Sequence, residues 1–170
     1  MRWVLDTNVV ASALLWGGNP RRLMRAGRSD SVKLFTSAPL IGELTEILLR
    51  PKFKRKIASS LLSVDQLVDL YLELAFLVKP TPIPRIASDP DDDVVIGTAI
   101  SAKAHFIVTG DAALLSVGGC EGGRVVSVIQ ALDAINRLIE SPGFYRQTSL
   151  GVSRIMKNKS GTGITKTKTW

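Results

Sequence analysis

Acidic side chains at the ends of short apolar runs are the part of this sequence that could do chemistry. They come from four separate segments: Asp6 in RWVLDTN, Glu43 in SAPLIGEL, the aspartates at 91–93 in DPDDDVVIG, and Asp111 in FIVTGD. Asp6 and Asp111 follow runs typical of buried parallel strands, and ligands bind beyond the carboxyl ends of such strands. Carboxylates gathered there repel one another unless a cation holds them, and Mg²⁺ and Mn²⁺ prefer carboxylate oxygen. The sequence therefore predicts a metal-dependent site for cutting phosphodiester bonds.

Helical geometry favours one acid of the 91–93 cluster. At ~100° per residue, Asp93 shares a face of the helix expected from Pro90 with apolar or small residues. These are Ile96, Gly97, Ile100 and Ala104. A carboxylate in a buried stripe is costly unless it is paired or binds metal, so Asp93 is the predicted site residue. Capping and the helix dipole account for Asp89, Asp91 and Asp92.

Glu43 borders an apolar stripe on its own expected helix, whereas Glu46 lies further toward solvent. The stripe consists of Leu40, Leu44, Ile47 and Leu48. Taken singly, Glu43 could be a surface acid, Asp6 a helix cap and Asp111 a turn residue. The functional interpretation gains weight because all four positions fall where loops or helices can meet one end of a sheet.

Other catalytic chemistry finds little support in the sequence. His105 is the only histidine, and it begins an expected strand instead of following one. There is no G-x-S-x-G elbow, no G-x-G-x-x-G or P-loop motif, and no Cys/His zinc spacing. Without a histidine base, a water activated by a metal is the natural nucleophile.

Strand and helix signals alternate along the chain. Strands are expected at 3–5, 32–36, 77–79, 106–109 and 125–128. Helices, with their caps, are expected at 7–16, 20–25, 36–49, 52–57, 63–76, 90–104, 112–115 and 129–140. The segments 80–84 and 116–123 (PTPIP and SVGGCEGG) read as loops. This order predicts an α/β fold with a parallel sheet covered by helices on both faces.

Composition indicates one globular domain followed by a basic extension. The chain has 170 residues, 45% of them hydrophobic, and its single cysteine excludes an internal disulfide and suits a reducing cytoplasm. No apolar run reaches the ~18–20 residues that span a bilayer, so no membrane association is expected. We expect a domain at 1–140 and a largely disordered extension at 141–170, which either attracts polyanions or is simply solvated. The extension has no acid and six basic residues: Arg146, Arg154, Lys157, Lys159, Lys166 and Lys168.

Four segments together resemble the PIN-domain family, and most of all its branch of VapC-like toxins of toxin–antitoxin pairs. They are VLDTNVVASALL, LIGELTEILLRPKF, DPDDDVVIGTAI and FIVTGD, and the resemblance covers about residues 2–135. The resemblance implies a three-layer α/β/α sandwich around a central parallel β-sheet. It also implies a cytoplasmic ribonuclease (an endoribonuclease) that depends on Mg²⁺ or Mn²⁺.

The resemblance also assigns site residues. The family's acids carry over to Asp6, Glu43, Asp93 and Asp111, as catalytic residues and metal ligands. Its supporting polar positions match Thr7, Asn8 and Thr109. Some family members have degraded sites and act as scaffolds or RNA binders, but here all four acids are present.

Basic residues near these motifs are candidates for holding RNA, expected to be single-stranded because the metals need an exposed, bent backbone. They are Arg21, Arg22, Lys52, Lys54, Arg55 and Lys56, although a solvated basic face explains them equally well. The resemblance further implies a cognate antitoxin that blocks the cleft and a homodimer, for which the apolar residues at 61–77 could supply the surface.

Two rival functions stay open. A non-catalytic module could use the fold and the extension to bind RNA or protein. A phosphatase or phosphotransfer domain also places an aspartate after the first strand, but the Asp-x-Asp pattern would need an acid where Asn8 stands.

Overall fold

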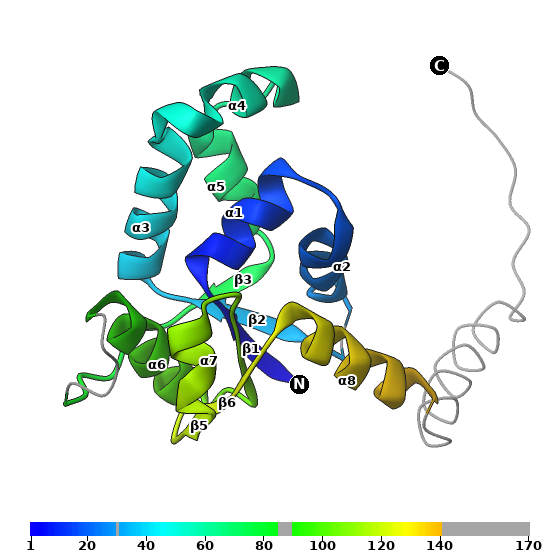
Figure 1. The fold of residues 1–170 in the computed structure, drawn as a ribbon, viewed down its shortest axis with the longest axis vertical. Coiled ribbons are helices and arrows are strands. Elements are labelled where there is room, and N and C mark those ends of the chain that lie inside the picture. Colours follow the sequence, from blue (N-terminus) through cyan, green and yellow to red (C-terminus); the bar gives the residue numbers. More distant parts are fainter. Residues whose placement is uncertain (30, 85–89, 141–170) are drawn as a thin grey trace, which may run out of the picture. The chain divides into compact units, whose positions relative to one another are not determined.

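One six-stranded sheet lies at the centre of this computed structural model, which describes residues 1–29, 31–84 and 90–140 (Figure 1). The strand order is β3-β2-β1-β4-β6-β5, and every pairing is parallel except that of β5 with β6. The strands are β1 (Arg2–Leu5), β2 (Lys33–Thr36), β3 (Ala75–Leu77), β4 (Phe106–Val108), β5 (Gly119–Cys120) and β6 (Gly123–Val126). The longer strands are short apolar runs, as expected where both faces of a parallel sheet are buried.

Helices connect the parallel strands, as right-handed crossovers require. They are α1 (Thr7–Leu15), α2 (Gly18–Ala26), α3 (Ala38–Leu49), α4 (Lys54–Ser60), α5 (Val64–Leu72), α6 (Pro90–Ala102), α7 (Ala112–Val117) and α8 (Val128–Glu140), with a 3₁₀ turn, η1 (Pro51–Phe53), before α4. Within the described part of the chain, no helix is long and apolar enough to cross a membrane.

The chain divides into two units, and the first, Met1–Leu132, holds the sheet. Of the second unit, Asp133–Trp170, only residues 133–140 at the end of α8 are described. The predicted basic extension at 141–170 lies outside the described residues, so the expected domain boundary stays a prediction.

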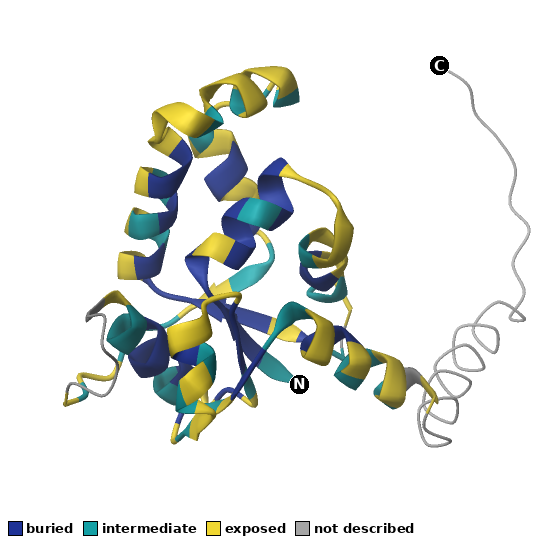
Figure 2. Ribbon diagram, in the orientation of Figure 1, coloured by how far each residue is buried: buried dark blue, intermediate teal, exposed yellow. Residues whose placement is uncertain are grey.

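Side chains alternate between the two faces of the sheet, and both faces are buried (Figure 2). On one face, Val4, Ile107 and Val125 join a core cluster with α6 residues such as Ile96 and Ala99. On the other face lie Trp3 and Leu34, both fully buried. Gly27, after α2, packs so closely here that an added Cβ would lie 2.6 Å from Leu34 Cδ1. The predicted α/β fold, with helices on both faces of the sheet, is confirmed.

Two regions of the chain differ from the sequence prediction. The helix expected to reach Phe76 ends at Leu72, and β3 occupies 75–77 instead of 77–79. This register pairs Phe76 with Phe35, whose ring centroids are 5.5 Å apart. The expected loop 116–123 instead completes α7 and forms an antiparallel hairpin with β6. Gly123 permits the hairpin, because its φ is +102° and an added Cβ would lie 2.5 Å from Ala104 O.

Candidate active site

Asp6 is buried at the point where β1 and β4 end side by side. Its backbone N–H donates to Val108 O at 2.9 Å, which extends the parallel pairing by one residue. The Thr109 hydroxyl then donates to Asp6 Oδ2 at 2.5 Å. Only 5% of Asp6 is exposed, so this charge-assisted hydrogen bond offsets part of the cost of burying a carboxylate.

The first turn of α1 holds the other oxygen of the same carboxylate. Asp6 Oδ1 accepts hydrogen bonds of 3.2 Å from the Thr7 hydroxyl and from the Asn8 backbone N–H. Asp6 is thus the N-cap of α1, where the helix dipole favours a negative charge. Both oxygens are oriented by the protein. Because Oδ1 already accepts two hydrogen bonds, a further ligand is best accommodated at Oδ2.

Asp111 follows Thr109 and caps the next helix. Its backbone N–H donates to the Thr109 hydroxyl at 2.9 Å, so one hydroxyl links the Asp111 backbone to Asp6. Asp111 Oδ1 accepts from the N–H groups of Ala113 and Leu114, at 2.7 and 3.0 Å, which fixes the start of α7. The two strand-end aspartates are therefore held in one hydrogen-bonded unit.

Glu43 reaches the same place from α3 and is half-buried. Its burial raises the pKa of its carboxyl group above the ordinary value of 4.5. The nearby Thr7 hydroxyl opposes this shift, the charges of Asp6 and Asp91 reinforce it, and the charge of Arg50 opposes it. The pKa of Glu43 is therefore influenced by acids from two other segments of the chain.

These acids line one cavity of about 340 Å³. Its polar lining comprises Asp6, Asn8, Glu43, Arg50, Asp91, Asp92 and Asp111. A second cavity, also of about 340 Å³, shares Asp6, Asn8 and Asp111 and extends toward Ser12 and Pro20. The strand-end aspartates can thus be approached from two sides.

Asp93 is not part of this lining, contrary to the sequence prediction. It lines a different cavity, together with Pro39, Lys79 and Ile83, whereas its neighbours Asp91 and Asp92 face the acidic one. The structure brings together the other three predicted acids and replaces Asp93 with two residues that had been explained as helix caps.

The sequence pattern of α6 favoured a different face from the one that lines the acidic cavity, because α6 is covered on more than one side. The sheet side of the helix is formed by Val95, Ile96, Thr98, Ala99 and Ala102, all at most 3% exposed. At ~100° per residue, positions 91 and 92 flank the middle of that face, and position 93 points away from it. Gly97 lies under the segment 80–83, since an added Cβ would be 2.4 Å from Thr81 O. A helix that is apolar nearly all round gives no unique stripe.

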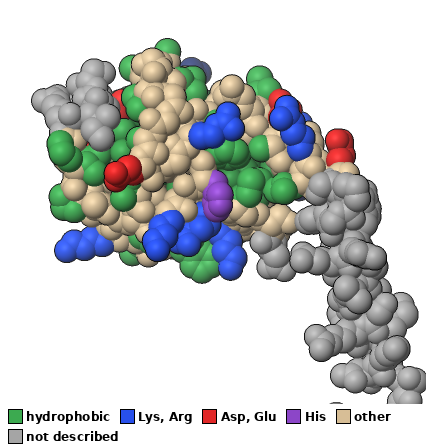
Figure 3. Space-filling view, turned by 90° about the horizontal axis from the view of Figure 1, so that it is seen from below, with side chains coloured by type: hydrophobic (Ala, Val, Ile, Leu, Met, Phe, Trp, Pro, Cys, Tyr) green, Lys and Arg blue, Asp and Glu red, His purple; other side chains and the backbone are tan. Residues whose placement is uncertain are grey.

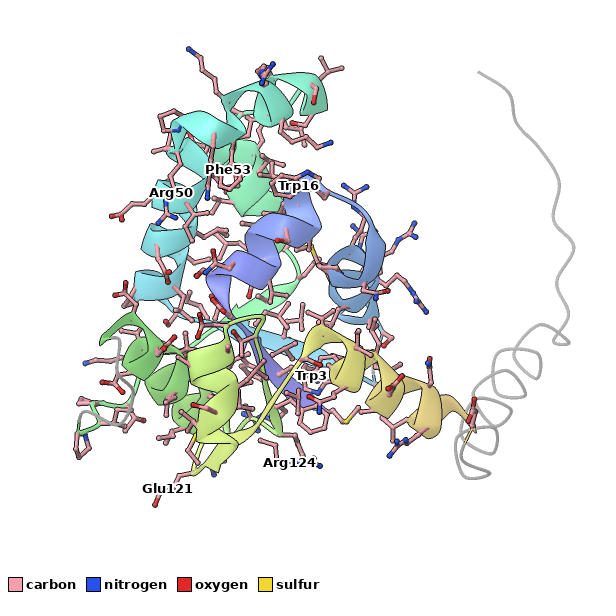
Figure 4. All side chains as sticks on the ribbon, in the orientation of Figure 1. Trp3, Trp16, Arg50, Phe53, Glu121 and Arg124 are labelled. Atoms are coloured by element: carbon pink, nitrogen blue, oxygen red, sulfur yellow. The ribbon has the colours of Figure 1, made fainter. Side chains whose placement is uncertain are left out.

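Arg50 is a cleft residue that the sequence interpretation missed. It directly follows α3 and lines the acidic cavity (Figure 4). The signal was present, because position 50 is seven residues, about two helical turns, after Glu43.

The predicted RNA-binding residues lie outside both acidic cavities. Arg21 donates to the carbonyls of Ala13 and Leu14 at 3.3 Å, which satisfies the end of α1, and Arg22 donates to Asn19. The remaining four, Lys52, Lys54, Arg55 and Lys56, are exposed in η1 and α4.

His105 lies at the amino end of β4, whereas the acids gather at the carboxyl ends of the strands. Its Nδ1 accepts a hydrogen bond of 3.1 Å from the Arg2 backbone N–H. Figure 3 shows Lys and Arg side chains around this histidine on the face seen from below. The acidic cleft therefore contains no imidazole from the described chain.

The residues of the cleft fit a hard divalent cation, because the side chains that could bind an ion there are mainly carboxylates, which offer oxygen atoms. Among the described residues, however, no group of three or more Asp, Glu, His or Cys side chains is arranged closely enough to hold a metal ion. Binding an ion would thus require the carboxylates to rotate toward one another.

The chain belongs to the PIN-domain family, since the family model described as PIN domain matches residues 2–113. PIN domains are generally nucleases that use divalent metal ions. The chain is also similar in fold to a chain in the crystal structure of VapBC2 from Rickettsia felis bound to a DNA fragment from their promoter. That likeness has a TM-score of 0.50 at 13% identity and covers 75% of this chain and 98% of the other. None of the curated proteins matches the sequence. The predicted family and fold are confirmed.

Proposed function

We propose that the protein is a metal-dependent endoribonuclease that hydrolyses phosphodiester bonds of single-stranded RNA in the cytoplasm. One observation carries the proposal: carboxylates from four separate segments line a single cavity at the carboxyl ends of the strands. Gathering such a set in one cavity is costly, because like charges repel. Membership in a family of nucleases supports the same reaction class.

Asp6 is the proposed central ligand, because the Thr109 hydroxyl and the start of α1 fix its orientation. Asp111 orients one oxygen toward the backbone of α7 and can offer the other to a ligand. From α6 we assign Asp92, with Asp91 beside it, in place of Asp93.

The bound Mg²⁺ or Mn²⁺ would supply Lewis-acid activation of water and neutralise charge on the phosphate. Glu43 lines the same cavity as Asp6, and its raised pKa makes its carboxylate a better proton acceptor than an ordinary glutamate. Arg50 supplies positive charge in the same cavity, where it can pair with a phosphate oxygen of the substrate.

A linear, unpaired substrate suits the site. The two cavities that share Asp6 and Asp111 leave room for a strand on both sides of the acids. A rigid A-form duplex presents its backbone less readily to such a cleft. We therefore place the scissile phosphate near Asp6, with the strand continuing into both cavities.

A protein partner forms the second part of the proposal: the chain acts as the toxin of a VapC-like pair. Its fold resembles a chain of VapBC2. A further cavity of about 390 Å³ has an apolar floor from Met24, Leu67 and Leu70 and a rim that includes Arg21, Arg25 and Arg28. An antitoxin segment with leucine-like and acidic side chains would match it in shape and charge.

The antitoxin proposal is tested by co-purification with the product of the adjacent open reading frame. Reversing Arg25 and Arg28 to Glu should release the partner, whereas Arg22→Glu, outside the rim, should not. Sedimentation of the chain alone tests the homodimer, for which Leu61, Leu70 and Leu72 are exposed at 91, 39 and 37%.

The nuclease proposal is tested with labelled single-stranded RNA in Mg²⁺, Mn²⁺ or EDTA. Wild type should cleave only with metal, and Asp6→Asn and Asp92→Asn should each lose at least a hundredfold in rate. Asp93→Asn, one residue away, is the matched control and should retain activity.

Activity that depends on Asp93 and not on Asp92 would contradict the assigned site. Cleavage that survives Asp6→Asn would point to a contaminant. RNA bound by wild type but never cleaved with any metal would favour the non-catalytic binding module.

A further inference from the structure

An aromatic pair, one ring exposed and one half-buried, lies close to Arg50, a residue that lines the acidic cleft. Trp16, directly after α1, and Phe53, in η1, have ring centroids 5.5 Å apart and ring planes at 76°. Trp16 is 42% exposed. Figure 4 shows both side chains where α1 and α3 end, near Arg50. Tryptophan combines a large apolar face with low conformational entropy, which makes an exposed one suited to contact.

Positive charge surrounds this pair. The Lys52 ammonium lies 4.9 Å from the centroid of the Phe53 ring, in the geometry of a cation–π contact. Lys54, Arg55 and Lys56 follow on α4, and all are exposed. Aromatic rings flanked by cations are the pattern that binds single-stranded nucleic acid, because bases stack on the rings while phosphates pair with the cations.

A short segment of chain links the aromatic pair to the cleft. Arg50 lines the cavity that contains Asp6, and Phe53 follows three residues later. Asp6 and Trp16 flank the nine-residue helix α1, and the helical rise over the ten residues from one to the other separates them by roughly 15 Å. A stacked strand rises ~3.4 Å per nucleotide, so this distance corresponds to about four nucleotides, or fewer in an extended strand.

We propose that Trp16, Phe53 and Lys52 form a stacking platform for a base of single-stranded RNA, up to about four nucleotides from the phosphate held at Asp6. This inference rests on the proposed nuclease function and names where its substrate binds. The platform is sequence-tolerant, since every base has a face that can stack. A longer RNA strand would therefore gain affinity by extending from the cleft past Arg50 to the platform.

The test measures affinity for RNA of two, four and eight nucleotides, by competition with a labelled octamer in EDTA so that no strand is cut. In wild type, affinity should rise with length as the strand reaches the platform. In wild type the octamer should bind more tightly than the dinucleotide. Trp16→Ala should reduce this ratio of affinities by about tenfold, whereas Trp16→Phe should retain most of it. Affinity for the dinucleotide should not change in either variant.

Phe76→Ala is the matched control. Phe76 is also exposed, at 54%, its ring centroid is 5.5 Å from that of Phe35, and Lys33 Nζ lies 5.8 Å from its centroid. It belongs to the edge strand β3 and lines neither acidic cavity. Its removal should leave the length dependence intact.

Intrinsic fluorescence gives a second readout, which does not depend on whether the Trp16→Ala variant is stably folded. The chain has three tryptophans, Trp3, Trp16 and Trp170. Octamer RNA should quench wild-type emission, and Trp16→Phe should abolish that quenching while Trp3 and Trp170 remain.

An equal loss in Phe76→Ala, or duplex RNA bound with the same dependence on Trp16, would overturn the platform. Normal cleavage by wild type, with length dependence unchanged in Trp16→Ala, would reject the platform and leave the nuclease standing. Trp16-dependent octamer binding without cleavage under any metal would support the platform and reject the nuclease.

Discussion

At the scale of single residues, the site is organised around one hydroxyl. Thr109 donates to Asp6 and accepts from the Asp111 backbone, so its position fixes both strand-end acids. Glu43 is held differently, by partial burial on a helix, and its protonation is correspondingly easier. The cleft thus combines carboxylates oriented by hydrogen bonds with one whose proton affinity is set by its surroundings.

The raised pKa of Glu43 predicts a pH-dependent stability. Because the folded state binds this proton more tightly than the unfolded chain, Glu43 contributes stability below pH 4.5, and that contribution is lost as pH rises through the folded-state pKa. In EDTA, the Tm of Glu43→Gln should therefore be close to the wild-type Tm near pH 4 and higher than the wild-type Tm at neutral pH. Thermal unfolding at a series of pH values measures the difference.

Glu46→Gln controls for removing one acidic charge from the same helix, because Glu46 is exposed. The same pH trend in both variants would mean that net charge, and not the cleft, causes the effect.

At the scale of elements, each acid is delivered by the start or body of a different helix. Asp6 caps α1, Asp111 caps α7, and Asp92 lies in the first turn of α6, so three helix N-termini surround the cleft. Helix dipoles there stabilise negative charge, which lowers the cost of gathering acids before any ion arrives. Only Glu43 comes from the middle of a helix.

Two substitutions of Asp111 separate its structural role from its chemical role. Asparagine retains the oxygen that accepts from Ala113 and Leu114, so Asp111→Asn should preserve stability but reduce metal-dependent cleavage. Asp111→Ala removes the cap as well and should cost about 1 kcal/mol of unfolding free energy. Chemical denaturation and the RNA assay, run on both variants, make the comparison. Equal destabilisation by both variants would show that the charge, not the cap, holds α7.

At the scale of the whole molecule, charge is divided between regions. Residues 1–140 hold 16 basic and 15 acidic side chains, nearly balanced, while the acids of the cleft gather at one end of the sheet. Basic side chains surround His105 on the face seen in Figure 3, at the amino ends of the strands, and a separate basic group lies on α4. Negative charge is thus concentrated in the cleft, where a cation is favoured, and most basic side chains lie outside it.

Divalent metal should stabilise the whole fold. A ligand at 100 times its Kd adds about 2.7 kcal/mol to the free energy of unfolding, which raises Tm by roughly 5–10 °C in a protein of this size. We expect this rise when Mn²⁺ or Mg²⁺ replaces EDTA in differential scanning fluorimetry. Asp6→Asn should show little of it. An identical rise in that variant would place the stabilising ion elsewhere.

The sequence by itself determined the class of fold, and three of the four acids that it singled out line one cavity. Apolar runs ending in Asp6 and Asp111 set the parallel strands and placed both carboxylates at one edge, because the carboxyl ends of parallel strands coincide. A local signal also sufficed for the capping box of Ser63 and Gln66 at the start of α5.

Tertiary structure alone decided which acid of the 91–93 cluster faces the cleft. Helix α6 is packed against the sheet on one side and under the segment 80–83 on another, so hydrophobicity could not identify its inner face. The same holds for β3, whose register follows from the contact of Phe76 with Phe35. The meeting of Trp16 with Phe53 joins residues far apart in sequence, and only packing of the helices could bring them together.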